Sequence, residues 1–232
     1  MKMLKSILAI VISFFAVAAS AQTADEIINK YITAMGGAEK LASLQTVKME
    51  GSMSTQGVEV VLIITKKQLT GLRMDMDIMG TSNYQLATPV KGWIFMPVMQ
   101  QTEPQEMDAD QLAGVQNQMD IQGSLFNYKQ KGYTVEYVAT EKIDGKDAYK
   151  LKLVRGGKNL IYFIDATSGF VLKIQSKANV QGQEMDVESS FTDYKKNAEG
   201  FWFPYTSTTR QGVITFDKIS ANVPVDDKIF TN

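Results

Sequence analysis

The sequence contains no cysteine and no histidine. Without these side chains the Ser-His-Asp triad, the Cys-His pair and zinc sites built on imidazole or thiolate are impossible. An enzyme would have to rely on Asp, Glu, Lys, Tyr or Ser, and none of these occurs in a recognisable catalytic spacing. We therefore expect no enzymatic activity, no catalytic residue, no metal and no cofactor. Disulfides are excluded too, so an apolar core must stabilise the fold.

Long apolar runs are scarce, and the prominent one lies at the start of the chain. Lys2 and Lys5 form a short basic region, and residues 7–18 are almost wholly apolar. Ala19-Ser20-Ala21 then matches a small-x-small cleavage pattern, so residues 1–21 are predicted to be a signal peptide. No cysteine follows that could carry a lipid anchor. We expect an exported periplasmic protein, cleaved after Ala21 and not lipid-anchored.

Positive charge is not in excess either. The chain has 24 Lys and Arg residues against 25 Asp and Glu, a net charge of −1, and loss of the two leader lysines makes it −3. Nucleic-acid binding requires clustered positive charge, so we expect no such partner. Residues 22–232 contain no long repeat or low-complexity linker. They are predicted to form a single monomeric domain, long enough to bury a core without disulfides.

Three segments have the pattern of helices. Thr23-Ala24-Asp25-Glu26 reads as a capping box, and apolar residues follow at helical spacing as far as Met35, where two glycines end the pattern. A short second helix is predicted over Ala38–Leu44. A third, inserted helix is predicted over Asp108–Asp120, with Asp108 or Asp110 as its N-cap.

Most of the remaining chain alternates apolar and polar residues, which is typical of antiparallel strands with one apolar face. We predict a mainly β fold with helices (α+β). Its curved antiparallel sheet, or unclosed β-barrel, is covered by an N-terminal helix in the concavity and by the central inserted helix. In one strand, Met74, Met76 and Ile78 are predicted to point into the concave face, together with Trp93 or Phe95. Their alternates Arg73, Asp75 and Asp77 are predicted to face water.

Methionine is abundant: the chain has thirteen, eleven of them after the leader. Its flexible, polarisable side chain suits surfaces that accept variable apolar ligands. The apolar face either closes on a dry core or encloses a cavity, and the pattern alone leaves both open. For the cavity, we name the following candidate ligand-binding residues: Met49, Met53, Met74, Met76, Ile78, Trp93, Phe95, Leu112 and Met119.

Polar candidates are weaker. The acidic residues between Glu103 and Asp110 lack the glycine and terminal glutamate of an EF-hand loop, so a solvated loop with a helix cap is the better interpretation. Lys66-Lys67, at a predicted strand end, would suit a lipid phosphate or an anionic partner. Lysines at a sheet edge are also ordinary protection against edge pairing.

Several segments together resemble the LolA/LolB-type periplasmic lipoprotein carriers, a family with an unclosed β-barrel covered by helices. The resemblance covers nearly all of residues 22–232. The segments that carry it are Ile64-Thr65-Lys66-Lys67 with Arg73–Asp75, Gly92–Pro97 with Gln100-Gln101, Phe163–Gly169 with Val171-Leu172, Gly200–Pro204, and Asn222–Phe230.

The resemblance implies a carrier that binds the acyl chains of a lipoprotein, or another lipid, for transfer toward the outer membrane, with possible inner- and outer-membrane envelope partners. The family's acceptor-type carriers are anchored through a cysteine that is absent here, so the match is to the soluble branch. That branch has an arginine before a proline that holds the lid shut. Lys67 takes the nearest position, as a polar lid contact, and Gln68 replaces the proline. The alternative is a non-catalytic structural or interaction module of the cell envelope.

Overall fold

The computed structural model describes residues 23–180 and 183–232, and the predicted signal peptide lies outside them. Its strands form one antiparallel sheet. The first six are β1 (Thr46–Thr55), β2 (Val58–Lys67), β3 (Gly71–Ile78), β4 (Thr81–Ala87), β5 (Gly92–Phe95) and β6 (Gln105–Glu106). The other seven are β7 (Thr134–Ile143), β8 (Lys146–Arg155), β9 (Lys158–Asp165), β10 (Val171–Val180), β11 (Gln183–Lys196), β12 (Trp202–Thr209) and β13 (Gly212–Ala221).

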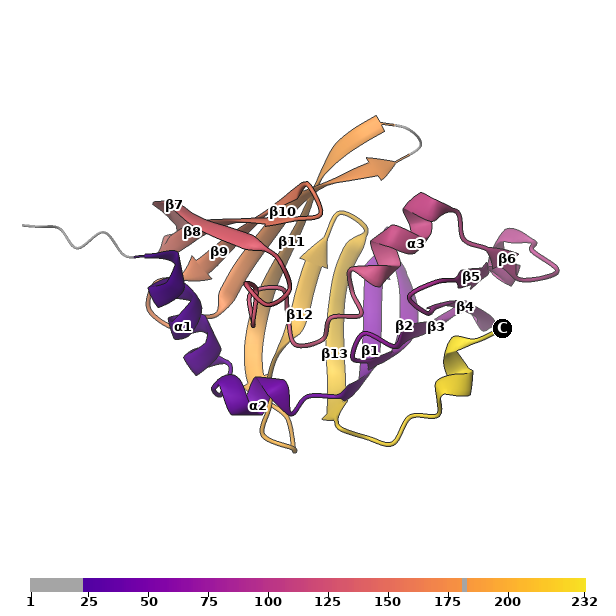
Figure 1. Ribbon diagram of the computed structural model, residues 1–232. Helices are drawn as coiled ribbons and strands as arrows, with labels where there is room; N and C mark the ends of the chain where they lie inside the picture. Colours follow the sequence, from indigo (N-terminus) through magenta and orange to yellow (C-terminus); the bar gives the residue numbers. More distant parts are fainter. Residues whose placement is uncertain (1–22, 181–182) are drawn as a thin grey trace, which may run out of the picture.

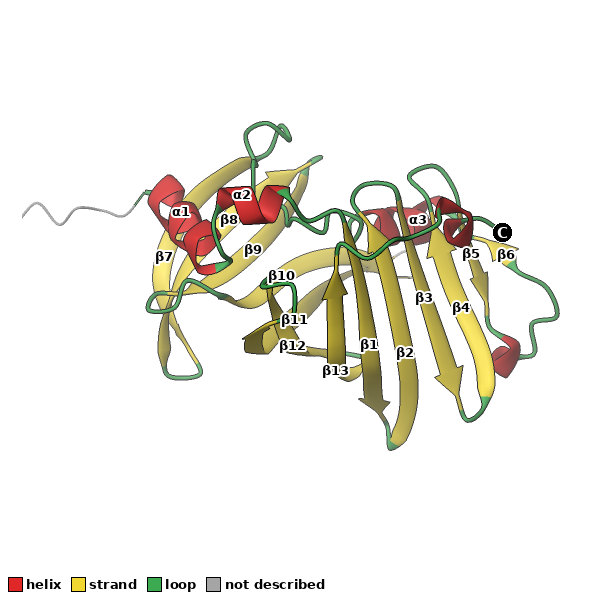
Figure 2. Ribbon diagram, turned by 90° about the horizontal axis from the view of Figure 1, so that it is seen from below, coloured by secondary structure: helices red, strands yellow, loops and turns green. Residues whose placement is uncertain are grey.

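The sheet is curved and unclosed. Its order is β6-β5-β4-β3-β2-β1-β13-β12-β11-β10-β9-β8-β7, so the short β6 is one edge and β7 the other. Every neighbouring pair except β1–β13 is consecutive along the chain, and the segment containing the inserted helix connects the two edge strands, β6 and β7. Figure 2 shows β13 and β1–β4 side by side, with the inserted helix behind them. The predicted fold class is confirmed.

Hairpin turns follow from the sequence at several places. In Gln56-Gly57, Asp144-Gly145 and Gly156-Gly157 both residues have positive φ, the conformation of a two-residue type I′ turn. Glycine adopts this conformation without steric cost, and Asp tolerates it better than most residues do. The same geometry occurs at Met79-Gly80, which sequence inspection did not single out.

The N-terminal helix α1 (Ala24–Ala34) begins as predicted. Thr23 is its N-cap, and the side chains of Thr23 and Glu26 each accept a hydrogen bond from the other's backbone amide. A short helix, α2 (Ala38–Ala42), follows Gly36 and Gly37, both of which have positive φ. α1 lies at the end of the sheet formed by β7–β9, and α2 lies below β12 (Figure 1), where Lys40 donates a hydrogen bond to the carbonyl oxygen of Glu199 in the turn before β12.

The core under α1 is the largest of the three apolar clusters in the described residues. Ile27, Ile28 and Tyr31 of α1 pack on Leu151 of β8 and Ile164 of β9, and all five are buried. Tyr133, just before β7, and Val135 and Tyr137 of β7 pack against this core, as their period-two spacing predicts. α1 therefore lies on the concave face of the sheet, as expected.

The inserted helix α3 (Ala109–Gln116) covers the other end of the same face (Figure 1). Asp108 is its N-cap and forms a capping box with Gln111. Val115 and, just after the helix, Met119 are buried against Leu72 of β3. The helix is shorter than predicted, because residues 117–133 form turns that cross back toward β7.

The C-terminal segment covers part of the convex face. Its 3-10 helix η2 (Asp227–Phe230) contacts β3 and β4, and a second 3-10 helix, η1 (Pro97–Met99), lies against β4. Phe230 is 1% exposed. A Cβ atom on Gly71 would lie 2.4 Å from the Phe230 ring, so this contact requires glycine.

We expect Ile27→Ala to lower the free energy of unfolding by about 2–5 kcal/mol, because a buried aliphatic side chain leaves a cavity. Urea unfolding followed by circular dichroism measures this. The control is Asn29→Ala, on the exposed side of α1, for which we expect a change within about 0.5 kcal/mol. Equal effects of the two substitutions would contradict the placement of α1.

Candidate functional site

A cavity of about 660 Å³ opens on the concave face, between the areas covered by α1 and α3. Its volume lies within the roughly 300–1,000 Å³ typical of small-molecule sites. Met49, Ile64 and Met74 form part of its floor and are in register across β1, β2 and β3. The other apolar lining residues come from the middle and far strands: Leu160, Tyr162, Ile174, Val187, Phe191, Pro204, Ile214 and Phe216.

A second cavity of about 270 Å³ lies nearer α1 and α2. Its lining is mostly apolar and aromatic, including Tyr31, Phe201 and Trp202. The two cavities share five lining residues, namely Ser124, Tyr162, Ile174, Phe191 and Pro204. They therefore lie side by side along one apolar surface.

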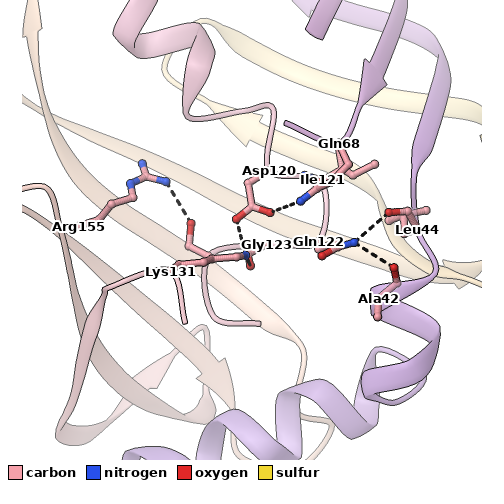
Figure 3. A network of polar contacts seen from close by, with 10 residues as sticks. Ala42, Leu44, Gln68, Asp120, Ile121, Gln122, Gly123, Lys131 and Arg155 are labelled. Atoms are coloured by element: carbon pink, nitrogen blue, oxygen red, sulfur yellow. Dashed lines mark hydrogen bonds and ion pairs between the residues drawn. The ribbon is translucent and has the colours of Figure 1, made fainter. Parts of the chain in front are cut away.

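The segment after α3 passes between the two covers and is held by a polar network, which Figure 3 shows. Asp120 forms an ion pair with Lys131 at 2.6 Å, and these side chains are 9% and 19% exposed. Asp120 also accepts a hydrogen bond from Gln68, whose side-chain oxygen accepts one from the backbone amide of Ile121. The turn after β2 is thus bound to the inserted segment.

The same segment reaches α2 and β8. The side chain of Gln122 donates hydrogen bonds to the carbonyl oxygens of Ala42 and Leu44. Arg155 of β8 donates to the hydroxyl of Ser124 (Figure 3). These contacts tie the inserted segment to the N-terminal helices on one side and to the far strands on the other, over the shared wall of the two cavities.

Lys66 is a charged residue in an apolar setting. It is in register between Val47 and Leu72, which are 2% and 0% exposed, and it lines the larger cavity. Loss of hydration on burial disfavours the ammonium and lowers the pKa of Lys66 to about 8. Within the described part of the chain, Lys66 forms neither a hydrogen bond nor an ion pair.

The predicted methionine and helix residues are distributed unevenly around this cavity. Met49 and Met74 line it. Met53, Met76 and Ile78 lie on the same face of the sheet and are half-buried, but they are farther along the strands and do not line the cavity. Leu112 and Met119 pack on β3 beneath α3. As ligand contacts, all these residues remain proposals.

The predicted facing of Trp93 and Phe95 is wrong. Trp93 pairs with Leu86 of β4, which in turn pairs with Arg73 of β3, and Phe95 is related to Asp75 in the same way through Tyr84. Paired residues share a face of the sheet, so Trp93 and Phe95 lie on the convex face with Arg73 and Asp75. Ile94, between them, is related to Met74 through Gln85 of β4 and lies on the concave face. It packs instead against the apolar cluster beneath α3 that contains Val115 and Met119. This strand is apolar on both faces, so alternation could not identify the inner one.

Arg73, Asp75 and Asp77 of β3 lie on the convex face, but as a group they are only partly exposed to water, contrary to the prediction. Asp77 is exposed, but Arg73 forms an ion pair with Asp75 at 2.7 Å and donates a hydrogen bond to the carbonyl oxygen of Ile229. The C-terminal segment therefore covers the ion pair of Arg73 and Asp75 in part.

Lys67 does not contact the lid as predicted. It lies on the convex face and forms an ion pair with Asp227 at 2.6 Å. The lid contacts come from the two residues after it: the side chain of Gln68, and the backbone amide of Leu69, which donates to the carbonyl oxygen of Met119.

Several cavity and network residues were not chosen from the sequence. Phe191 shares the period-two spacing of Met185 and Val187 on one strand face, so it could have been assigned to the lining. Asp120 and Lys131 gave no signal, because their pairing depends on how residues 117–133 turn. Nor could the sequence separate Lys66, which faces the cavity, from Lys67, which faces away.

In the described ranges there is no cluster of three acidic side chains able to hold a metal ion. Nor does that part of the chain contain a helix long and apolar enough to cross a membrane.

We expect Lys66→Met to stabilise the protein at pH 7 by about 2 kcal/mol, because it removes an uncompensated charge from a half-buried position between apolar neighbours. Below pH 8 the lysine is protonated in both the folded and unfolded states, so the unfavourable free energy of its charge in the folded protein is fully present. Between pH 8 and about 10.4 the unfolded chain keeps a proton that the folded protein has lost, so the wild type gains stability as pH rises. The difference from the variant should therefore shrink over this window.

Urea unfolding of both proteins at pH 7, 8, 9 and 10 measures this difference. Asp110, Arg155, Lys158 and Lys177, which also line the cavity, are present in both proteins. A difference that stays constant with pH, or a variant that is less stable at pH 7, would contradict the burial of an uncompensated charge.

We expect Asp120→Asn to lower the free energy of unfolding by about 1–3 kcal/mol, since it leaves Lys131 unpaired in a mostly buried position. Hydrogen exchange should speed up in residues 117–133 before it does elsewhere. The control is Asp147→Asn, whose ion pair with Lys142 is exposed and should contribute less than about 1 kcal/mol. Unchanged exchange in residues 117–133 would show that the pair does not hold the segment.

No protein-family model matches the sequence, and no curated protein matches it by sequence. Solved structures do match in fold. The LolA superfamily protein NE2245 from Nitrosomonas europaea aligns with a TM-score of 0.57 at 17% identity, covering 91% of this chain and 99% of the other. A putative outer membrane lipoprotein-sorting protein domain from Vibrio parahaemolyticus gives a TM-score of 0.54 at 14% identity, covering 88% and 94%.

A DUF1329 family protein from Desulfovibrio piger gives a TM-score of 0.58 at 14% identity, covering 89% of this chain and 96% of the other. These identities establish a likeness of fold across almost the whole length of each chain. The chain therefore has a LolA/LolB-like fold.

Proposed function

We propose that this protein is a non-enzymatic periplasmic carrier. It would bind the acyl chains of a lipoprotein, or another lipid, in the cavity on the concave face, for transfer toward the outer membrane. The observation that carries the proposal is the 660 Å³ cavity, whose apolar lining residues extend across the sheet from β3 to β9. The LolA/LolB-like fold and the predicted signal peptide support the same interpretation.

The shape of the site suits a chain-like ligand better than a compact one. The larger cavity continues into the second one along five shared residues. An extended hydrocarbon would contact flexible methionines at one end and aromatic rings at the other. The segment over the shared wall is held by hydrogen bonds and one ion pair, which can break and re-form without disturbing the sheet.

Hydrocarbon burial sets the expected affinity. About ten methylenes at roughly 0.8 kcal/mol each give about 8 kcal/mol before the costs of association. A dissociation constant of about 1 μM corresponds to about 8.2 kcal/mol, so micromolar binding is near the upper limit for one chain. We propose that the carrier acts as a monomer, with envelope proteins of the inner and outer membranes as donor and acceptor and no nucleic-acid partner.

We expect a fluorescent fatty acid to bind the purified protein at micromolar concentration, and saturating ligand to raise the melting temperature. Met74→Glu should weaken binding at least ten-fold, because it places a carboxylate in the floor of the cavity. The control is Met79→Glu, in an exposed turn where the methionine is 84% exposed. It should bind like the wild type.

A second variant, Ser207→Trp, fills cavity space without removing an apolar contact, and should also weaken binding. Native mass spectrometry of protein prepared from periplasm, before and after organic extraction, should show a lipid-sized adduct that extraction removes. No adduct and no dye binding at saturation would overturn the carrier proposal and favour the interaction module.

A further inference from the structure

The cavity is positively charged, although the chain as a whole is not. Lys66, Arg155, Lys158 and Lys177 line it, against one acidic residue, Asp110. The whole chain has a net charge of −1. A carrier of neutral hydrocarbon alone would have no use for this excess, since charged groups beside an apolar ligand lose hydration.

The four cationic side chains differ in their hydrogen-bond and ion-pair partners and in their exposure to solvent. Arg155 donates a hydrogen bond to Ser124, and Lys177 forms an ion pair with Glu184 at 2.8 Å. Lys158 is exposed at the start of β9. Lys66 differs from the other three. It points to the concave face, the residues paired with it on β1 and β3 are buried, and it has no hydrogen-bond or ion-pair partner among the described residues.

The position of Lys66 relative to the apolar floor is fixed by the sheet. Lys66 and Ile64 are two residues apart on β2 and so point to the same face. Ile64 is in register with Met49 and Met74, which makes the lysine the next side chain along from the methionine row. A ligand with its hydrocarbon on that row would bring an end group within reach of the ammonium.

We infer that Lys66 binds the anionic head group of the cargo, so that the cavity selects acidic amphiphiles over neutral ones of equal chain length. This inference rests on the proposed function and names the class of ligand. The recognised chemistry is a carboxylate or phosphate oxygen accepting a charge-assisted hydrogen bond from the ammonium. The low pKa of Lys66 is consistent with a charge that lacks a counter-ion until ligand arrives.

The matched control is the adjacent lysine. Lys67 has the same side chain on the same strand, but it faces the convex side and pairs with Asp227. Lys66→Met and Lys67→Met therefore remove the same charge from opposite faces. Methionine keeps most of the length of the lysine stem, so the Lys66 variant retains its apolar packing.

The experiment is calorimetric titration at pH 7 of wild type, Lys66→Met and Lys67→Met with dodecanoate, dodecyl phosphate and dodecanol. We expect wild type and Lys67→Met to bind at least one of the two acids about ten-fold or more tightly than dodecanol. Lys66→Met should lose that preference while still binding dodecanol. The acid with the larger loss identifies the head group as carboxylate or phosphate.

The outcomes separate this inference from the proposal on which it rests. Equal micromolar binding of the acids and the alcohol by wild type would overturn the head-group role and leave the carrier standing. So would an acid preference that survives in Lys66→Met, or one lost equally in Lys67→Met. Failure of all three ligands to bind wild type would overturn both.

Discussion

The structure depends on covering one continuous apolar face of a sheet that does not close. Thirteen strands, curved but open at β6 and β7, expose more concave surface than one helix can cover. α1 buries Ile27, Ile28 and Tyr31 at one end, and α3 with its following turn buries Val115 and Met119 at the other. The middle of the face is left unfilled by α1, and there the cavity is found, with Asp110, Gln111 and Gly114 of α3 along one side of it. Space for a ligand is thus a consequence of the architecture, not of any single residue.

The two covers are not independent, because residues 117–133 connect them. Asp120 and Lys131 pair at the centre of that segment, Gln68 joins it to β2, and Gln122 joins it to α2. These polar contacts include the mostly buried Asp120–Lys131 ion pair, and they hold the segment against both covers. A ligand entering beneath them would have to compete with a few hydrogen bonds, whereas the sheet ladder and the α1 core would stay intact. A carrier of the proposed kind would need a stable frame and a cover that opens more easily than the frame does.

Much of the fold could be predicted from local signals. The capping box at Thr23 forms as expected, and Asp108, one of the two predicted N-caps, begins α3. The glycine-containing hairpin turns have the positive φ that glycine adopts readily. Period-two alternation correctly gave an antiparallel sheet with an apolar face. The LolA/LolB-like resemblance, stated from loose segments, agrees with the fold likeness to solved structures.

The failures in the site share one physical reason. Alternation divides a strand into two sets but does not say which set faces inward, and in β5 both sets are apolar. Trp93 and Phe95 were therefore assigned to the wrong face. The same parity problem applies to Lys67, which was predicted to contact the lid but lies on the convex face, while Lys66 lines the cavity. The cover on the convex face comes from η2, more than 150 residues away in sequence from Arg73, so no local pattern could predict it.

Methionine NMR is the most direct test of the central claim that ligand binds on the concave face between the two helical covers. Labelling the methionine methyl groups with ¹³C gives separate probes inside and outside the cavity. Met49 and Met74 line it, whereas Met79 and Met99 are 84% and 71% exposed elsewhere. On titration with dodecanoate, the account predicts that the signals of Met49 and Met74 shift and that those of Met79 and Met99 stay in place. Shifts confined to Met79 and Met99, or none at saturating ligand, would contradict it.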